Sequence, residues 1–241
     1  MGGEFTVARP AVKWKPMAAI KKEESAGSNP DGLFVVLEGI DGSGKTTAWE
    51  FLKKALASDS SVLFLREPTN LPTGTRLRAC LQGKEPAPNT DEGWMTLFLA
   101  DRKANVEQNV QPALNQGQVI VQDRYIYSTA AYQSASAGRA RELLEMQSHF
   151  PTPDLVIFLD LTPEQALQRI DRRSGEKGRE HFETLDRLER IYNNYQAILP
   201  ASCSRIDALQ PAAQVGQEIL SVIQSIRQNL DWAKGSGATR D

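Results

Sequence analysis

The stretch Gly39-Ile40-Asp41-Gly42-Ser43-Gly44-Lys45-Thr46-Thr47 decides the fold of this chain. It fits the pattern Gly-x-x-x-x-Gly-Lys-Thr without a mismatch. The apolar run Leu33–Leu37 precedes it, and an amphipathic stretch that ends near Ala57 follows it. The order strand, glycine-rich loop, helix is typical of proteins that bind nucleoside triphosphates, so we expect residues 39–47 to bind one.

The chemistry of this loop explains its residue types. Gly39, Gly42 and Gly44 allow the backbone to curl until several N–H groups point into one concavity. A helix that begins near Lys45 adds the positive end of its dipole. Lys45 then places a charge on the terminal phosphates, and the Thr46 hydroxyl is placed to bind Mg²⁺.

Composition excludes several other classes of protein. The 241 residues include 28 basic and 30 acidic ones, a formal charge of −2, which disfavours sequence-independent binding of nucleic acid. No apolar stretch is long enough to cross a membrane. The two cysteines, Cys80 and Cys203, fit no metal-binding spacing, so we expect free thiols and a cytoplasmic protein.

Buried strands that alternate with helices predict an α/β fold. Five short, mostly continuous apolar runs indicate parallel strands covered by helices on both faces. We therefore predict a P-loop domain with one five-stranded parallel sheet and a short lid. The five runs are Leu33–Glu38, Val62–Arg66, Val119–Asp123, Leu155–Asp160 and Ser204–Asp207.

Helix signals and composition set the boundaries. We expect a long helix from Asp91 to about Leu114, a capping box at residues 162–165, and a last helix over 211–230. Residues 1–31 lack apolar periodicity and predict a flexible extension, with a targeting peptide as the alternative. The domain then covers 32–230, and 231–241 form a disordered tail.

Three arginines from separate segments meet at the edge where the triphosphate loop lies. Arg66 ends the second predicted strand, Arg124 follows Asp123 at the end of the third, and Arg102 lies on the helix between them. Ligands of parallel sheets bind beyond the carboxyl ends of the strands. The arginines therefore predict a second anionic ligand, and phosphoryl transfer between two nucleotides, which needs alignment and charge cancellation rather than a strong base.

At this point the sequence resembles the thymidylate (dTMP) kinases, from about Leu33 to about Ile226. The motifs that carry the resemblance are Arg66-Glu67-Pro68 with Pro72, Gly74 and Arg78; Phe98 with Arg102; Asp123 to Gln133; and Pro153 to Glu164. The resemblance implies transfer of the γ-phosphate of MgATP to dTMP, giving dTDP.

The family also implies roles for residues on the acceptor side. Phe98 would stack on the thymine ring, Arg102 would hydrogen-bond a carbonyl of the base, and Thr129 would bind another edge. Tyr132 would crowd the sugar 2′ position and disfavour ribose.

Further roles concern phosphate and metal. Arg66 and Arg124 would grip the acceptor phosphate, with Arg78 as a further candidate. Asp41 would lie near the acceptor sugar and Mg²⁺. The expected metal ligands are Thr46, Asp41 and Asp123, and the expected catalytic residues include Lys45, Arg124 and Asp41.

The lid is predicted at about residues 172–182, a basic loop between two helices. Family members with glycine in place of arginine in the glycine-rich loop carry the basic residue in the lid, and this chain has Gly42. It resembles that bacterial-like type, and Arg173 or Arg179 is the expected catalytic lid arginine.

The chain departs from the family where Thr69-Asn70-Leu71 stands in place of Gly-Gly-Thr. This leaves two alternatives open. One is a kinase of the same fold for a modified pyrimidine deoxynucleotide or a deoxynucleoside. The other is a nucleotide-binding module without turnover.

The resemblance also implies a homodimer. The predicted helix 91–114 carries more apolar side chains than one sheet face needs, and related members pair through that region as two-fold dimers. These side chains are Trp94, Leu97, Phe98, Val106, Val110 and Leu114.

Overall fold

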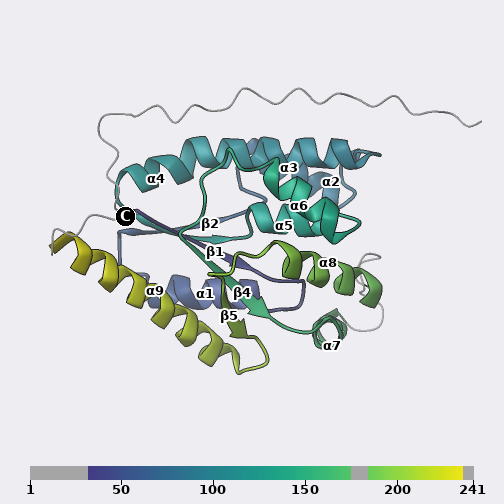
Figure 1. Cartoon of the computed structure of the whole chain (residues 1–241). Helices are drawn as coiled ribbons and strands as arrows, with labels where there is room; N and C mark the ends of the chain where they lie inside the picture. The colour runs from purple at the N-terminus through teal and green to yellow at the C-terminus, as the bar shows by residue number, and fades with distance from the viewer. Residues whose placement is uncertain (1–31, 175–183, 236–241) are drawn as a thin grey trace, which may run out of the picture.

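A computed structural model describes residues 32–174 and 184–235 of the chain (Figure 1). Its centre is a five-stranded sheet in the order β2-β3-β1-β4-β5, and every neighbouring pair is parallel. The prediction of one parallel sheet is therefore confirmed. The strands are β1 (Leu33–Glu38), β2 (Val62–Arg66), β3 (Val119–Asp123), β4 (Leu155–Asp160) and β5 (Ser204–Asp207).

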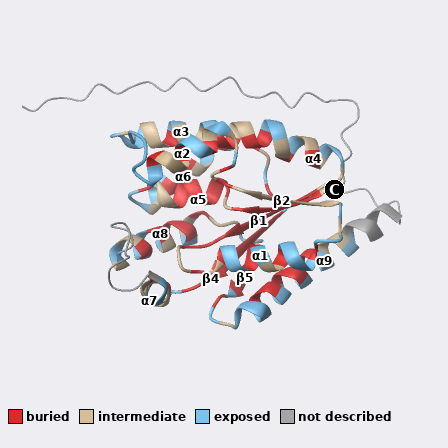
Figure 2. Ribbon diagram, turned by 180° about the vertical axis from the view of Figure 1, so that it is seen from behind, coloured by how far each residue is buried: buried red, intermediate tan, exposed pale blue. Residues whose placement is uncertain are grey.

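Burial explains why continuous apolar runs become the central strands. All six residues of β1 and all five of β3 are buried, as a strand covered on both faces requires. β2 and β5 form the two edges and are less buried. Figure 2 shows the same pattern, with buried residues concentrated in the sheet and on the inner sides of the helices.

Helices cover both faces of the sheet (Figure 1). α1 (Lys45–Ala55) and α9 (Ala212–Gly235) pack together on one side. On the other side lie α2 (Pro72–Leu81), α3 (Asp91–Asn105) and α4 (Gln111–Asn115). The remaining helices are α5 (Ile126–Tyr132), α6 (Ala137–Glu145), α7 (Pro163–Ser174) and α8 (Leu185–Ile198).

The long helix predicted over 91–114 is present but is not uniform. Thr90 caps it by accepting a hydrogen bond from the Gly93 N–H. Between α3 and α4 the segment η1 (Val106–Val110) takes a π-helical turn. Pro112 has no N–H to donate to the preceding turn, and the wider turn lies just before it.

Two other helix ends bear on the predictions. The capping box at the start of α7 is confirmed, because Thr162 and Gln165 exchange backbone-to-side-chain hydrogen bonds of 3.2 and 3.4 Å. The last helix was predicted to end near Leu230, but it continues to Gly235. No glycine or proline lies between Gly216 and Gly235, so the sequence contains no helix-breaking residue that would end α9 earlier.

The loop between β2 and α2 is held by a buried carboxylate. Asp101, on α3, accepts hydrogen bonds from the Thr69 N–H (2.8 Å), the Thr69 hydroxyl (2.5 Å) and the Thr73 hydroxyl (3.0 Å). Gly74 lies so close to this loop that an added Cβ would overlap the backbone N and O of Thr69. The loop that follows Arg66 is therefore fixed from two sides.

This close approach predicts an unusual response to alanine. Gly138, an exposed glycine in α6, has open space around it, so Gly138→Ala should stabilise the protein by up to about 1 kcal/mol. Gly74→Ala, also in a helix, should instead cost about 1–3 kcal/mol, because the methyl group must displace Thr69. Urea unfolding of both variants tests this, and stabilisation by Gly74→Ala would contradict the packing.

Candidate active site

The glycine-rich loop has the curled backbone that its sequence predicts. Gly42 and Gly44 have φ of 80° and 96°, a region that only glycine adopts readily. At Gly42 a side chain is excluded by space as well, because its Cβ would lie 2.7 Å from the Ala166 carbonyl oxygen. The loop therefore leads directly from β1 into α1 with Gly44 as the N-terminal cap residue.

Lys45 is buried in this loop. Its Nζ donates to the carbonyl oxygens of Gly39 (2.7 Å) and Ile40 (2.9 Å). Burial, together with the neighbouring Arg124 charge, lowers the pKa of Lys45 to about 8, and the nearby Asp41 opposes this shift. The lysine is a cation with a weakened hold on its proton.

An ion pair joins the glycine-rich loop to the end of β3. Arg124 Nη2 lies 2.5 Å from Asp41 Oδ1, and the same guanidinium lies over the Tyr132 ring at 4.9 Å. Burial alone would raise the pKa of Asp41, but Arg124 and Lys45 outweigh it and hold that pKa below its usual value. Asp41 is therefore ionised near neutral pH. A negative charge is what its predicted position near Mg²⁺ requires.

The second strand-end arginine is also paired. Arg66 Nε donates to Asp123 Oδ2 at 3.1 Å, and its guanidinium stacks on the Trp49 ring at 4.5 Å. Trp49 in turn donates to the Leu65 carbonyl. The planar guanidinium is thus held at the edge of the sheet by one carboxylate and one aromatic face.

Arg102 is only 1% exposed, so it is more deeply buried than we expect for a side chain whose main role is to contact a ligand. Its Nη2 donates to Glu67 (2.6 Å) and to the Thr129 hydroxyl (2.9 Å), and its Nη1 donates to Gln147. The two residues predicted to read separate edges of the base therefore bond each other. Phe98, one turn earlier on α3, is half-buried.

Arg78, a further candidate for the acceptor phosphate, bonds the protein itself in this structure. Its guanidinium donates to the carbonyls of Pro68 (3.0 Å) and Thr69 (2.7 Å) and to the Asn70 side chain (2.9 Å). These three bonds brace the loop that follows Arg66. The departure from the family at residues 69–71 thus supplies an acceptor, Asn70, that the arginine uses.

Sequence reasoning missed three residues that organise this edge. Glu38 is completely buried and accepts four hydrogen bonds, and Glu67 joins Arg102 to Asn105. Arg169 on α7 lies near Gly44 and donates to the Ala208 carbonyl. The sequence did contain a signal for Glu38, because a carboxylate at the end of an otherwise apolar strand is unusual. Nothing in the sequence around Arg169 indicated a role at this edge.

Part of the predicted lid can be located. Arg173 lies exposed in the last turn of α7. Arg179 and the rest of the lid after Ser174 lie outside the described residues.

Unsatisfied polar atoms concentrate at this edge. Within the described part of the chain, six buried side-chain atoms have no hydrogen-bond partner, and all six belong to residues of the loop, the adjoining strand ends or the elements that cover them. They are Ser43 Oγ, Arg66 Nη2, Arg102 Nε, Asp123 Oδ1, Tyr125 OH and Tyr132 OH. Buried polar groups normally find partners, so this edge holds donors and acceptors suited to a polar ligand.

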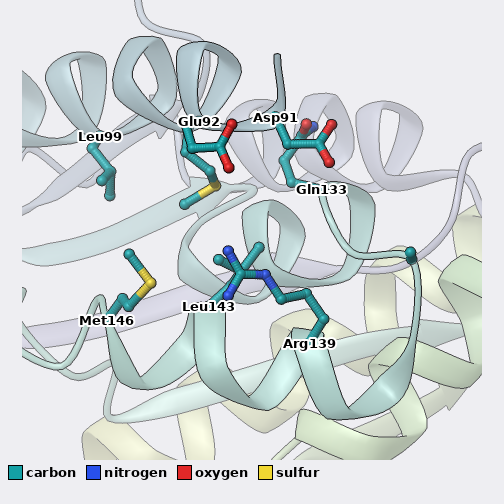
Figure 3. Close-up of a pocket in the computed structure, with 9 residues that line it drawn as sticks. Asp91, Glu92, Leu99, Gln133, Arg139, Leu143 and Met146 are labelled. Carbon is teal, nitrogen blue, oxygen red and sulfur yellow. The ribbon is translucent and has the colours of Figure 1, made fainter. Parts of the chain in front are cut away.

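Two hollows are lined by described residues. One, of about 370 Å³, contains Arg66, Arg78 and Asn70 in its lining and has the size of a small-molecule site. The other, between α3 and α6, is smaller at about 90 Å³ and contains none of the predicted ligand-binding residues. Figure 3 shows Asp91 and Glu92 from α3 and Arg139 and Leu143 from α6 around it.

Two further features are absent from the described residues. None of their helices is long and apolar enough to cross a membrane. They include no group of three or more His, Cys, Asp or Glu side chains that could hold a metal ion by itself.

A glycine-rich loop and a set of arginines on one edge of a parallel sheet define the class of P-loop phosphotransferases. Within that class, a family profile for thymidylate kinase matches residues 37–219. The chain belongs to the thymidylate kinase family, and the resemblance seen in its sequence is confirmed.

Named relatives support this assignment over most of the chain. A thymidylate kinase of Leptospira interrogans is 41% identical over 197 residues, which cover 80% of this chain and 95% of the relative. One from Xanthomonas oryzae is 36% identical over 214 residues, covering 88% and 91%. One from Desulfotalea psychrophila is 32% identical over 200 residues, covering 83% and 98%.

The lowered pKa of Lys45 predicts how ATP binding depends on pH. The charged form binds phosphate, and the free protein loses that charge as pH rises through about 8. The Kd for ATP should therefore rise roughly tenfold between pH 7 and pH 9. Calorimetric titration measures it, with Lys45→Ala as the control that binds weakly without this dependence. Constant wild-type affinity up to pH 9 would disprove the assignment.

Proposed function

We propose that this protein transfers the γ-phosphoryl group of ATP to the phosphate of dTMP, giving ADP and dTDP. The observation that carries the proposal is the gathering of unpartnered buried polar atoms around the glycine-rich loop, in a chain of the thymidylate kinase family. Those atoms come from both the donor loop and the arginine-bearing strand ends, as a reaction between two nucleotides requires.

The donor phosphates bind in the loop of residues 39–47. The Lys45 ammonium exchanges its bonds to the Gly39 and Ile40 carbonyls for phosphate oxygens. The Thr46 hydroxyl is exposed in the first turn of α1, and Asp123 Oδ1 has no protein partner, so these two oxygens fit a magnesium ion that is held mainly by phosphates. Bound Mg²⁺ would neutralise charge on the transferred phosphoryl group.

The acceptor phosphate binds between Arg66 and Arg124. Arg66 keeps one buried Nη2 donor without a protein partner, and Arg124 reaches from the end of β3 to the donor loop. The two guanidinium groups offset repulsion between the two anions, while Asp41 orients Arg124 and lies near the acceptor sugar. Arg78 supports this site by bracing residues 68–70.

The base binds against α3 and α5. Phe98 stacks on the ring, and Thr129 lies beside Arg102 at 2.9 Å. Of the Arg102 donors, Nε is the one without a protein partner, so we assign it to a thymine carbonyl. The Tyr132 ring, under the Arg124 guanidinium, crowds the sugar 2′ position.

A deoxynucleoside acceptor fits less well, because a hydroxyl nucleophile needs a nearby base. Three carboxylates at this edge are already engaged: Asp41 pairs with Arg124, Asp123 pairs with Arg66, and Glu38 is buried under four hydrogen bonds. The departure at Thr69 and Asn70 is absorbed by Asp101 and Arg78, so it needs no altered substrate.

A coupled assay across acceptors tests the proposal. With MgATP, dTMP should be phosphorylated faster than modified pyrimidine deoxynucleotides, and thymidine should not react. Lys45→Ala should lower kcat for dTMP by about a hundredfold or more, the scale of one lost preorganised donor. Preferred turnover of thymidine would favour the nucleoside kinase, and no turnover of any acceptor would favour a binding module.

The lid arginines belong to the same proposal. Arg173 is the described candidate for a cation that meets charge between donor and acceptor, and Arg179 is the other. The two cysteines are both free thiols, which fits the cytoplasm.

We also propose that two chains pair through α3. The fold divides the apolar residues of the long helix: Val106 and Val110 belong to the core, whereas Trp94 and Leu97 are half-buried and lie outside the core of the described residues. Leu81, which ends the neighbouring α2, is 46% exposed. Apolar surface of this kind is typical of an interface between two copies.

Sedimentation at micromolar concentration should therefore give twice the 26.6 kDa mass of the chain. Trp94→Asp should shift the protein toward monomer, because it places a charge in the interface. Leu209→Asp should not, because this exposed leucine lies between β5 and α9, away from α3. A monomeric wild type would refute the pairing.

A further inference from the structure

Glu38 is a buried carboxylate with an unusual set of partners. It is the last residue of β1 and is completely buried. It accepts hydrogen bonds from the N–H groups of Tyr125 (2.9 Å) and Ser128 (3.3 Å) and from the hydroxyls of Ser128 (2.5 Å) and Tyr195 (2.9 Å). None of the ion pairs found among the described residues includes it.

Two of its three partner residues, Tyr125 and Ser128, follow closely after Arg124 in the chain. Arg124 has φ of 69°, and it is the one residue other than glycine with positive φ in the described part of the chain. Such a conformation is costly and persists only where the surroundings fix it. The Arg124 N–H donates to the Leu37 carbonyl at 3.1 Å, and Gln122 donates to the Arg124 carbonyl at 2.9 Å. Glu38 then fixes Tyr125, the next residue, and Ser128 in the first turn of α5.

Tyr195, on α8, completes the arrangement from 157 residues further along the chain than Glu38. Its hydroxyl donates to Glu38 Oε2 at 2.9 Å and lies 2.9 Å from the Ser128 Oγ, and its ring packs edge-on against Tyr132. Tyr132 is the ring beneath the Arg124 guanidinium. Tyr195 therefore contacts both supports of Arg124, the turn that sets its backbone and the ring that carries its side chain.

We propose that Glu38, completed by Tyr195, is the positioning residue for Arg124, holding its guanidinium where the acceptor phosphate binds. The inference rests on the proposed dTMP kinase function. Glu38 itself touches no nucleotide, because its carboxylate is enclosed by its four donors. Four donors also explain why a carboxylate is used: it accepts from all of them without presenting a competing N–H.

A double-mutant cycle tests this positioning role. Glu38→Gln should lower kcat/KM for dTMP about tenfold while leaving ATP affinity within about twofold, since an amide N–H then replaces one oxygen that accepts from the turn. In the Arg124→Ala background the same change should have almost no further effect, because the group that Glu38 positions is gone. Titration of dTMP binding gives the same comparison without turnover.

Asp59→Asn is the matched control. Asp59 is a carboxylate that also accepts several bonds, from Ser61 and Arg227, but it lies at the opposite end of β2. This variant should lower the melting temperature while kcat/KM for dTMP stays within about twofold of wild type. A merely structural Glu38 would behave like Asp59.

Each result decides the matter. Full activity of Glu38→Gln, or an undiminished tenfold loss in the Arg124→Ala background, would overturn the positioning role while wild-type turnover keeps the kinase assignment. If Glu38→Gln does not fold, the cycle is repeated with Tyr195→Phe, which removes one hydroxyl. A wild type inactive on dTMP would overturn both proposals.

Discussion

The 2.5 Å contact between the Arg124 guanidinium and the Asp41 carboxylate links two segments that are 83 residues apart. Asp41 belongs to the loop that follows β1, and Arg124 follows β3, the strand paired with β1. Parallel pairing places the two strand ends at the same edge, and the ion pair then holds the loop after β1 against the turn after β3. The buried Lys45, the stacked Tyr132 and the proposed acceptor site all surround this contact.

The parts of the fold that follow from local pattern could be predicted from the sequence. The five strands match their predicted bounds, because continuous apolar runs between turn residues need cover on both faces. The capping box of α7 and the cap at Thr90 rest on residues three positions apart, so they were predictable as well. The π-helical turn before Pro112 was not, because a proline within a helical pattern only signals a break or a kink.

Side-chain partners across long sequence separations could not be predicted. Tyr195 and Glu38 are 157 residues apart, and nothing in either local sequence names the other. Arg102 was predicted to face the base, yet three protein acceptors occupy its terminal nitrogens. Arg78 likewise proved to bond the loop that precedes it. The sequence allowed us to recognise that several arginines converge on one site. Which of them contact a ligand and which support other residues depends on side-chain packing.

The two bonds from Lys45 to its own loop carry a consequence for exchange of the nucleotide. The Gly39 and Ile40 carbonyls and an incoming phosphate compete for the same ammonium group, so departure of the nucleotide does not leave a buried cation bare. In the free protein the two carbonyl oxygens take the place of the phosphate as partners of Lys45. This lowers the free-energy difference between the nucleotide-bound and the nucleotide-free protein. A protein that must release one nucleotide before it binds the next can therefore release it faster, and its affinity for the nucleotide is lower in return.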